Sequence, residues 1–150
     1  MNRYDAVEIL LVEDNPHDAE MTISALREQH LANEIFVVED GDEALDLLFC
    51  RGKFANRHPT KPLKAVFLDL KLPKLNGLEV LKEIKSNEKT KKLPVVIVTS
   101  SREDPDIETA YELGANGYVV KPVQFDAFRK AMTASGLFWL LVNQPPKGNF

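Results

Sequence analysis

The chain has 150 residues, a formal net charge of −4 and a hydrophobic fraction of 44%. This length fits one domain with a substantial core, and the composition excludes a disordered or fibrous chain. The acidic balance argues against a nucleic-acid surface, which needs clustered Lys and Arg.

The first half of the chain predicts a strand, a helix, a second strand and a second helix. The runs EILLV at 8–12 and EIFVVE at 34–39 are short and rich in β-branched or aromatic residues, as strands are. Between them Ala19, Ile23 and Leu26 recur at helical spacing, and GDEALDLLF follows as a compact helix-forming segment.

The second half repeats this alternation three times. Strand-like runs occupy 64–70, 94–100 and 117–120. Apolar residues at helical spacing follow each of them: Leu78, Leu81 and Ile84 after the first, the segment DPDIETAYELGA after the second, and Phe125, Phe128 and Met132 after the third. Continuously apolar strands that alternate with helices predict a parallel sheet covered on both faces.

Two segments depart from this compact repeat. The segment RGKFANRHPTKPLK at 51–64 is basic and carries two prolines, so we expect an extended, exposed loop. The densest basic stretch, KTKKLP at 89–94, is interpreted as a solvated helix end rather than a binding patch.

Several features indicate a cytoplasmic protein. Cys50 is the single cysteine, which excludes an intrachain disulfide, and the first residues lack a signal-peptide pattern. The longest apolar run, GLFWLLV, is far shorter than the roughly 20 residues of a membrane-spanning helix.

Polar and charged residues gather at the predicted carboxyl ends of four strands. Glu13 and Asp14 follow the first strand, Asp69 lies at the end of the third, Thr99 and Ser100 close the fourth, and Lys121 ends the fifth. In an open parallel sheet these ends meet at one edge, where ligands bind. Residues more than a hundred positions apart are therefore expected to form one cleft.

The residue types in this cleft predict phosphoryl chemistry. Three neighbouring carboxylates repel one another unless a cation neutralises them, and a small set of hard oxygen ligands suits Mg²⁺. Lys121 and the Thr99 hydroxyl suit phosphoryl oxygens, and a carboxylate can accept a covalent phosphate.

Four motifs in order, LLVEDN, FLDLKLPKLNG, VIVTSS and GANGYVVKP, resemble the receiver domains of two-component response regulators over about residues 7 to 135. The resemblance implies an α/β fold, a doubly wound five-stranded parallel sheet with strand order 2-1-3-4-5 and helices on both faces. It also implies that Asp69 accepts a phosphoryl group from a phosphohistidine of a sensor histidine kinase. Such a protein is a signalling phosphoacceptor that promotes only its own phosphorylation and dephosphorylation, and is not otherwise an enzyme.

The same resemblance implies a role for each site residue. Mg²⁺ is held by Glu13, Asp14, Asp69 and the main-chain carbonyl of Lys71, Thr99 and Tyr118 rearrange on phosphorylation, and the Lys121–Pro122 bond is cis. Taken singly, Asp14 fits an ordinary helix N-cap and Tyr118 fits plain packing. The joint placement at four strand ends favours the functional interpretation.

The remaining sequence predicts a single receiver domain over 1–150 that signals through protein contacts. Only 29 residues follow Lys121, too few for an output domain. The extension at about 136–150 is apolar at Phe138, Trp139, Leu140 and Leu141, which suits a homodimer interface or packing against the chain's own sheet. This ending and the long 51–64 segment resemble the single-domain regulators that work with phytochromes.

Two alternatives from other classes stay open. A Mg²⁺-dependent phosphohydrolase with an aspartate nucleophile shares this chemistry, although Lys71 stands where that class carries a second acid. A flavodoxin-like ligand-binding module needs a phosphate loop rich in Gly, Ser and Thr after the first strand, whereas this chain has the acidic VEDNPHD.

Overall fold

A computed structural model describes residues 4–29, 34–60, 62–134 and 136–137 of the chain. Its elements in chain order are β1 (Ile9–Val12), α1 (Pro16–Glu28), β2 (Ile35–Val38), α2 (Gly41–Leu48), the 3-10 helix η1 (Gly52–Phe54), β3 (Ala65–Leu68), α3 (Gly77–Ser86), β4 (Val95–Thr99), α4 (Asp104–Glu112), β5 (Gly117–Val120) and α5 (Phe125–Ala134). The predicted strands agree with these to within two residues at each end.

The five strands form one parallel sheet in the order β2-β1-β3-β4-β5. The predicted doubly wound architecture is confirmed. Strand β1 is paired on both sides, since Ile9 is level with Ile35 of β2 and with Ala65 of β3. The strand order therefore reverses at β1, and the crevice at the carboxyl ends of β1 and β3 is the position where such sheets bind ligands.

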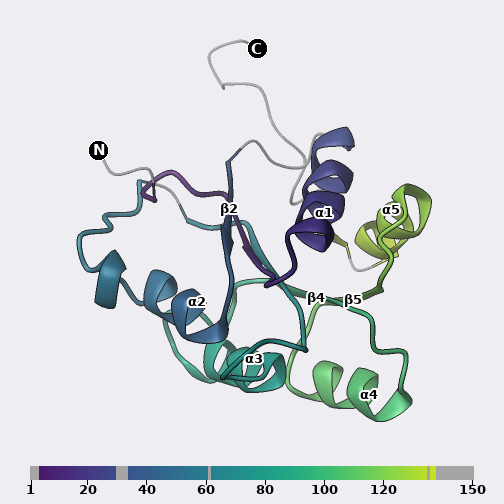
Figure 1. The fold of residues 1–150 in the computed structure, drawn as a ribbon. Coiled ribbons are helices and arrows are strands. Elements are labelled where there is room, and N and C mark those ends of the chain that lie inside the picture. Colours follow the sequence, from purple (N-terminus) through teal and green to yellow (C-terminus); the bar gives the residue numbers. More distant parts are fainter. Residues whose placement is uncertain (1–3, 30–33, 61, 135, 138–150) are drawn as a thin grey trace.

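Helices cover both faces of the sheet (Figure 1). Alternate strand residues serve each face: Ile9 and Leu11 pack with α1 and α5, whereas Leu10 and Val12 pack with α2, α3 and α4. Because the side chains of a strand alternate between faces, two fully covered faces require the continuously apolar strands seen in the sequence.

The chain turns sharply from β1 into α1. Asn15 is the N-cap of α1, and its side chain accepts a hydrogen bond from the backbone N–H of Asp18 at 3.0 Å. Pro16 follows at the first helical position, where a missing N–H is harmless. This cap fixes the short segment that carries Glu13 and Asp14 at the end of the sheet.

The expectation that residues 51–64 form an exposed loop is wrong for two of its side chains. Phe54 in η1 is 1% exposed and packs edge-on against Tyr4 and Phe36, with ring centroids 4.9 and 6.0 Å away. Arg57 is 5% exposed. The segment folds over the amino-terminal residues because the edge strand β2 leaves apolar surface that an aromatic side chain can cover.

We expect Phe54→Leu to lower the free energy of unfolding by about 1–2 kcal/mol, because leucine keeps most of the volume but loses two edge-on aromatic contacts. Urea denaturation monitored by circular dichroism measures this. Phe125→Leu is the matched control: Phe125 is exposed, so the change there should stay within about 0.5 kcal/mol. Equal effects at the two positions would show that Phe54 contributes no specific packing.

Within the described residues, no helix is both long and apolar enough to span a bilayer. The predicted interface residues Phe138, Trp139, Leu140 and Leu141 lie outside the described residues.

Candidate functional site

The predicted site residues meet at the carboxyl edge of the sheet. Glu13 directly follows β1, Asp69 directly follows β3, Thr99 is the last residue of β4, and Lys121 directly follows β5. The backbone ties these ends together, because the Asp69 N–H donates to the Val12 carbonyl at 3.1 Å and the Lys121 N–H donates to the Thr99 carbonyl at 2.8 Å. The parallel register thus creates the cleft that the sequence predicted.

Lys121 stands at the centre of the cleft. Its ammonium Nζ lies 2.6 Å from Glu13 Oε1, 2.7 Å from Asp69 Oδ2 and 2.9 Å from Asp18 Oδ2. Burial alone lowers the pKa of a lysine, but here the three carboxylates outweigh it and raise the pKa of Lys121 well above its usual value. The side chain is therefore a permanent cation among acids.

Both carboxylate oxygens of Asp69 accept hydrogen bonds. Oδ2 accepts from Lys121, and Oδ1 accepts from the backbone N–H of Lys71 at 3.0 Å. The turn after Asp69 packs tightly, since a Cβ on Gly77 would collide with the backbone carbonyl of Asp69 and with Leu70. Only glycine fits there, and the carboxylate, 5% exposed, is fixed in position at the mouth of the core.

The acidic residues fit a hard divalent cation. Glu13, Asp14 and Asp69 each offer an oxygen, and these oxygens lie within 4.8 Å of one another. Burial is the main cause that raises the pKa of Glu13 to about 7, against the opposing effect of Lys121. Ionisation of Glu13 is unfavourable because it is buried and lies beside two other carboxylates. A bound cation would stabilise the ionised form, so the cluster favours a positively charged ligand.

The loop between β4 and α4 is closed by a serine. The Ser101 hydroxyl donates to Asp106 Oδ2 at 2.6 Å, and the Ser101 carbonyl accepts from the Tyr118 hydroxyl at 3.1 Å. Thr99 is fully buried, and its hydroxyl accepts weakly from the Ser101 N–H at 3.5 Å. Burial raises the pKa of Tyr118, which keeps its hydroxyl a proton donor in this contact. Thr99 and Tyr118 are thus joined through Ser101.

Sequence reasoning missed Asp18 and Asp106, and it placed Ser101 beside the site without the contact between Ser101 and Asp106. Asp18 lies in the first turn of α1 and reaches Lys121 across 103 positions of sequence. The signal that could have indicated it is its place in the first helical turn directly after the acidic end of β1. Ser101 and Asp106 are five residues apart, which is not the three-residue spacing of a helix capping box, so no simple sequence pattern indicated their contact.

The peptide bond between Lys121 and Pro122 is cis, the isomer that the resemblance implied. The predicted main-chain contribution of Lys71 to a metal site stays a prediction, although its N–H does contact Asp69.

We expect Ser101→Ala to lower the free energy of unfolding by about 1–2 kcal/mol, because it removes a hydrogen bond to a carboxylate. Amide hydrogen exchange at the first turn of α4 should accelerate in the same variant. Ser100→Ala is the matched control. The Ser100 side chain, next to Ser101 in the sequence, is exposed, so this substitution should change neither the free energy of unfolding nor the exchange rate. Unchanged exchange in α4 would contradict the closing role of Ser101.

The model of the response regulator receiver domain matches residues 9–133 of this chain. The chain belongs to the receiver-domain family. This receiver is similar to response regulator Rcp1 of Synechocystis sp., at 36% identity over 132 residues, 88% of this chain and 88% of Rcp1. The solved Mn²⁺-bound form of Rcp1 has a TM-score of 0.74 at 34% identity, covering 92% of this chain and 97% of that one.

Two bacteriophytochrome response regulators have similar solved structures. RtBRR matches with a TM-score of 0.80 at 48% identity, covering 95% of this chain and 86% of its own. AtBRR matches with a TM-score of 0.78 at 51% identity, covering 93% of this chain and 99% of its own. Strand order and helices of this receiver agree with these neighbours, and the protein is a response regulator of the receiver type.

Proposed function

We propose that Asp69 accepts a phosphoryl group from the phosphohistidine of a sensor histidine kinase in a Mg²⁺-dependent reaction. The observation that carries this proposal is the placement of the Asp69 carboxylate between the Lys121 ammonium at 2.7 Å and the Lys71 N–H at 3.0 Å, beside two further acids. The carboxylate is therefore preorganised by contacts to both of its oxygens.

In the transfer, a carboxylate oxygen of Asp69 attacks phosphorus and forms a new P–O bond. The P–N bond to the donor imidazole breaks, and the imidazole nitrogen keeps that electron pair and takes up a proton. Lys121 exchanges its contact with the Asp69 oxygen for one with a phosphoryl oxygen, so positive charge is already in place where negative charge gathers. The Thr99 hydroxyl donates to another phosphoryl oxygen, and Tyr118 follows the rearranged loop through Ser101.

Glu13, Asp14, Asp69 and the carbonyl of Lys71 would hold Mg²⁺. When bound, this ion neutralises charge shared by the carboxylates and the incoming phosphoryl group. The three convergent oxygens, and a relative solved as a Mn²⁺-bound form, support a divalent cation here. An acidic cleft that also admits phosphate requires such a cation, because Lys121 alone supplies one charge against three carboxylates.

The kinase that we propose as partner is a phytochrome-type sensor. The support is the similarity to two proteins named bacteriophytochrome response regulators and to Rcp1.

We propose that the chain acts in the cytoplasm as a single receiver domain over 1–150, in keeping with its one cysteine, and passes the signal to another protein by direct contact. The alternative function, a phosphohydrolase with an aspartate nucleophile, is disfavoured because Lys71 stands where that class of enzyme carries a second acidic residue.

Intact mass spectrometry tests the acceptor chemistry. Protein incubated with acetyl phosphate and Mg²⁺ should gain one phosphoryl group, and protein treated with a chelator should gain none. Some receivers are not phosphorylated by small-molecule donors, so if acetyl phosphate gives no gain in mass the experiment is repeated with an autophosphorylated histidine kinase as the donor. If neither donor adds a phosphoryl group, the proposal is contradicted.

We also propose that the apolar extension, with Phe138, Trp139, Leu140 and Leu141, mediates a homodimer. Six consecutive apolar residues from Leu137 to Val142 support this, since such a surface seeks a partner. Light scattering at high concentration, with and without beryllofluoride, should give twice the monomer mass in at least one state. A monomer in both states would contradict the proposal.

A further inference from the structure

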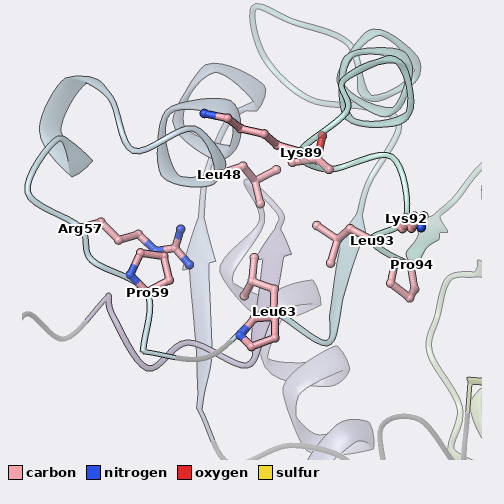
Figure 2. A pocket seen from close by; sticks show the side chains of 10 residues that line it. Leu48, Arg57, Pro59, Leu63, Lys89, Lys92, Leu93 and Pro94 are labelled. Carbon is pink, nitrogen blue, oxygen red and sulfur yellow. The ribbon is translucent and has the colours of Figure 1, made fainter.

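A pocket lies beside the segments that lead into β3 and β4, at the amino ends of these strands (Figure 2). It has a volume of about 350 Å³, within the range of ligand-binding sites. Its apolar wall comes from Leu48 at the end of α2, Leu63 before β3 and Leu93 before β4. We call it the loop pocket. Since parallel strands begin here and end at Asp69, the two sites occupy opposite edges of the sheet.

The charged side chains that line the loop pocket are all cationic. They are Arg57, Lys89 and Lys92, and no acidic residue lines it. The neighbouring Lys91 is neutralised by Glu88 at 3.0 Å, whereas no carboxylate of the described residues pairs with Lys89 or Lys92. In a chain with a net charge of −4, a purely cationic lining is a local exception that favours a negatively charged ligand.

Arg57 supplies an independent observation. Its side chain is buried, and its guanidinium donates from Nε to the Tyr4 carbonyl and from Nη1 to the Leu47 carbonyl, both at 3.1 Å, and to Cys50 Sγ at 3.7 Å. All three acceptors are neutral, and no carboxylate of the described residues forms an ion pair with Arg57; the nearby Asp5 Oδ1 accepts instead from the backbone N–H of His58 at 2.8 Å. A buried cation without a counter-charge is costly, and a ligand carboxylate would relieve that cost.

The arrangement of these groups favours a peptide over a small anion. Figure 2 shows Arg57 on one side of the loop pocket and Lys92 on the other, with Leu63 and Leu93 between them. A complementary ligand carries negative charge on both sides of an apolar group. An extended chain segment with an apolar residue between acidic ones has this pattern, and guanidinium and ammonium groups both bind carboxylates well.

We propose that the loop pocket binds an acidic peptide segment of a partner protein, which places an apolar side chain against Leu48, Leu63 and Leu93 and its flanking carboxylates near the three cations. The sequence alone favours a solvated helix end for the basic stretch at 89–94, whereas this proposal gives Lys89 and Lys92 of that stretch a role in ligand binding. That stretch begins after α3 has ended, and Thr90 within it is buried and donates to the Ile84 carbonyl at 2.7 Å. The proposal does not depend on the function proposed for Asp69.

Selection from a random heptapeptide library on the full-length protein tests this proposal. We expect the enriched sequences to carry Asp or Glu on both sides of a large apolar residue. The Kd of the most enriched peptide, measured by fluorescence anisotropy, should weaken about tenfold or more in Lys89→Glu/Lys92→Glu protein, because two attractive contacts become repulsive.

The control variant is Lys82→Glu/Lys130→Glu, which changes the net charge equally at exposed positions outside the loop pocket. Its Kd should stay within about twofold of the wild-type value. No enrichment, enriched peptides without acidic residues, or equal weakening in both variants would overturn the proposal. Tighter binding of a synthetic peptide with the sequence NQPPKGNF than of the most enriched library peptide, measured in the same anisotropy assay, would assign the loop pocket to the chain's own last residues and overturn the proposal as well.

Discussion

Asp69→Asn protein should gain no phosphoryl group from acetyl phosphate and Mg²⁺ under conditions that phosphorylate the wild type. Asparagine has nearly the same shape as aspartate and can still accept from the Lys71 N–H, so the fold is retained. It lacks the negative oxygen that attacks phosphorus, and it removes one carboxylate from the acidic cluster. The expected change is therefore a complete loss of incorporation, measured by intact mass spectrometry.

The matched control is Asp126→Asn. Asp126 lies exposed in the first turn of α5, away from the cleft, and this variant should be phosphorylated to the wild-type extent. Circular dichroism on both variants checks that they are folded. Incorporation that survives in Asp69→Asn protein would assign the acceptor to another residue.

Lys121→Met protein should be less stable than the wild type by about 3 kcal/mol in the absence of divalent cations. The wild-type ammonium lies within 2.9 Å of three carboxylates and is 10% exposed, whereas Glu13 and Asp69 are almost fully buried. Removal of the cation leaves these carboxylates to repel one another. Urea denaturation in a chelating buffer measures the loss.

Mg²⁺ should restore much of this stability, because a cation that binds only the folded state stabilises it by mass action. The same Mg²⁺ concentration should stabilise the wild type less, since Lys121 already neutralises part of the cluster. Lys130→Met, at an exposed position of α5, is the control and should respond as the wild type does. A Lys121→Met variant with wild-type stability in chelator would contradict the role of Lys121 as the counter-charge of the cleft.

The sequence was sufficient to predict the sheet and the convergence of Glu13, Asp69, Thr99 and Lys121. The reason is physical: continuously apolar strands demand a sheet that is covered on both faces, and parallel strands bring their carboxyl ends to one edge. A position relative to a strand end therefore fixes a position in space to within a side-chain length.

The residues that escaped prediction lie on helices and loops. The contact of Asp18 with Lys121 depends on where the first turn of α1 sits above β5, and that is set by packing between distant segments. Phe54 and Arg57 read as members of a basic, proline-containing loop, yet both are buried. Local composition describes a loop as polar, but its burial depends on apolar surface left uncovered elsewhere in the fold.

The central claim is that Asp69 carries the phosphoryl group, and its most direct test is to locate the modified residue chemically. Borohydride reduces an aspartyl phosphate to homoserine, so phosphorylated wild-type protein is reduced, digested and sequenced by tandem mass spectrometry. The account predicts homoserine at position 69 and at no other position, and only in samples that contained Mg²⁺. Homoserine at another aspartate, or its absence from protein shown to be phosphorylated, would contradict the account.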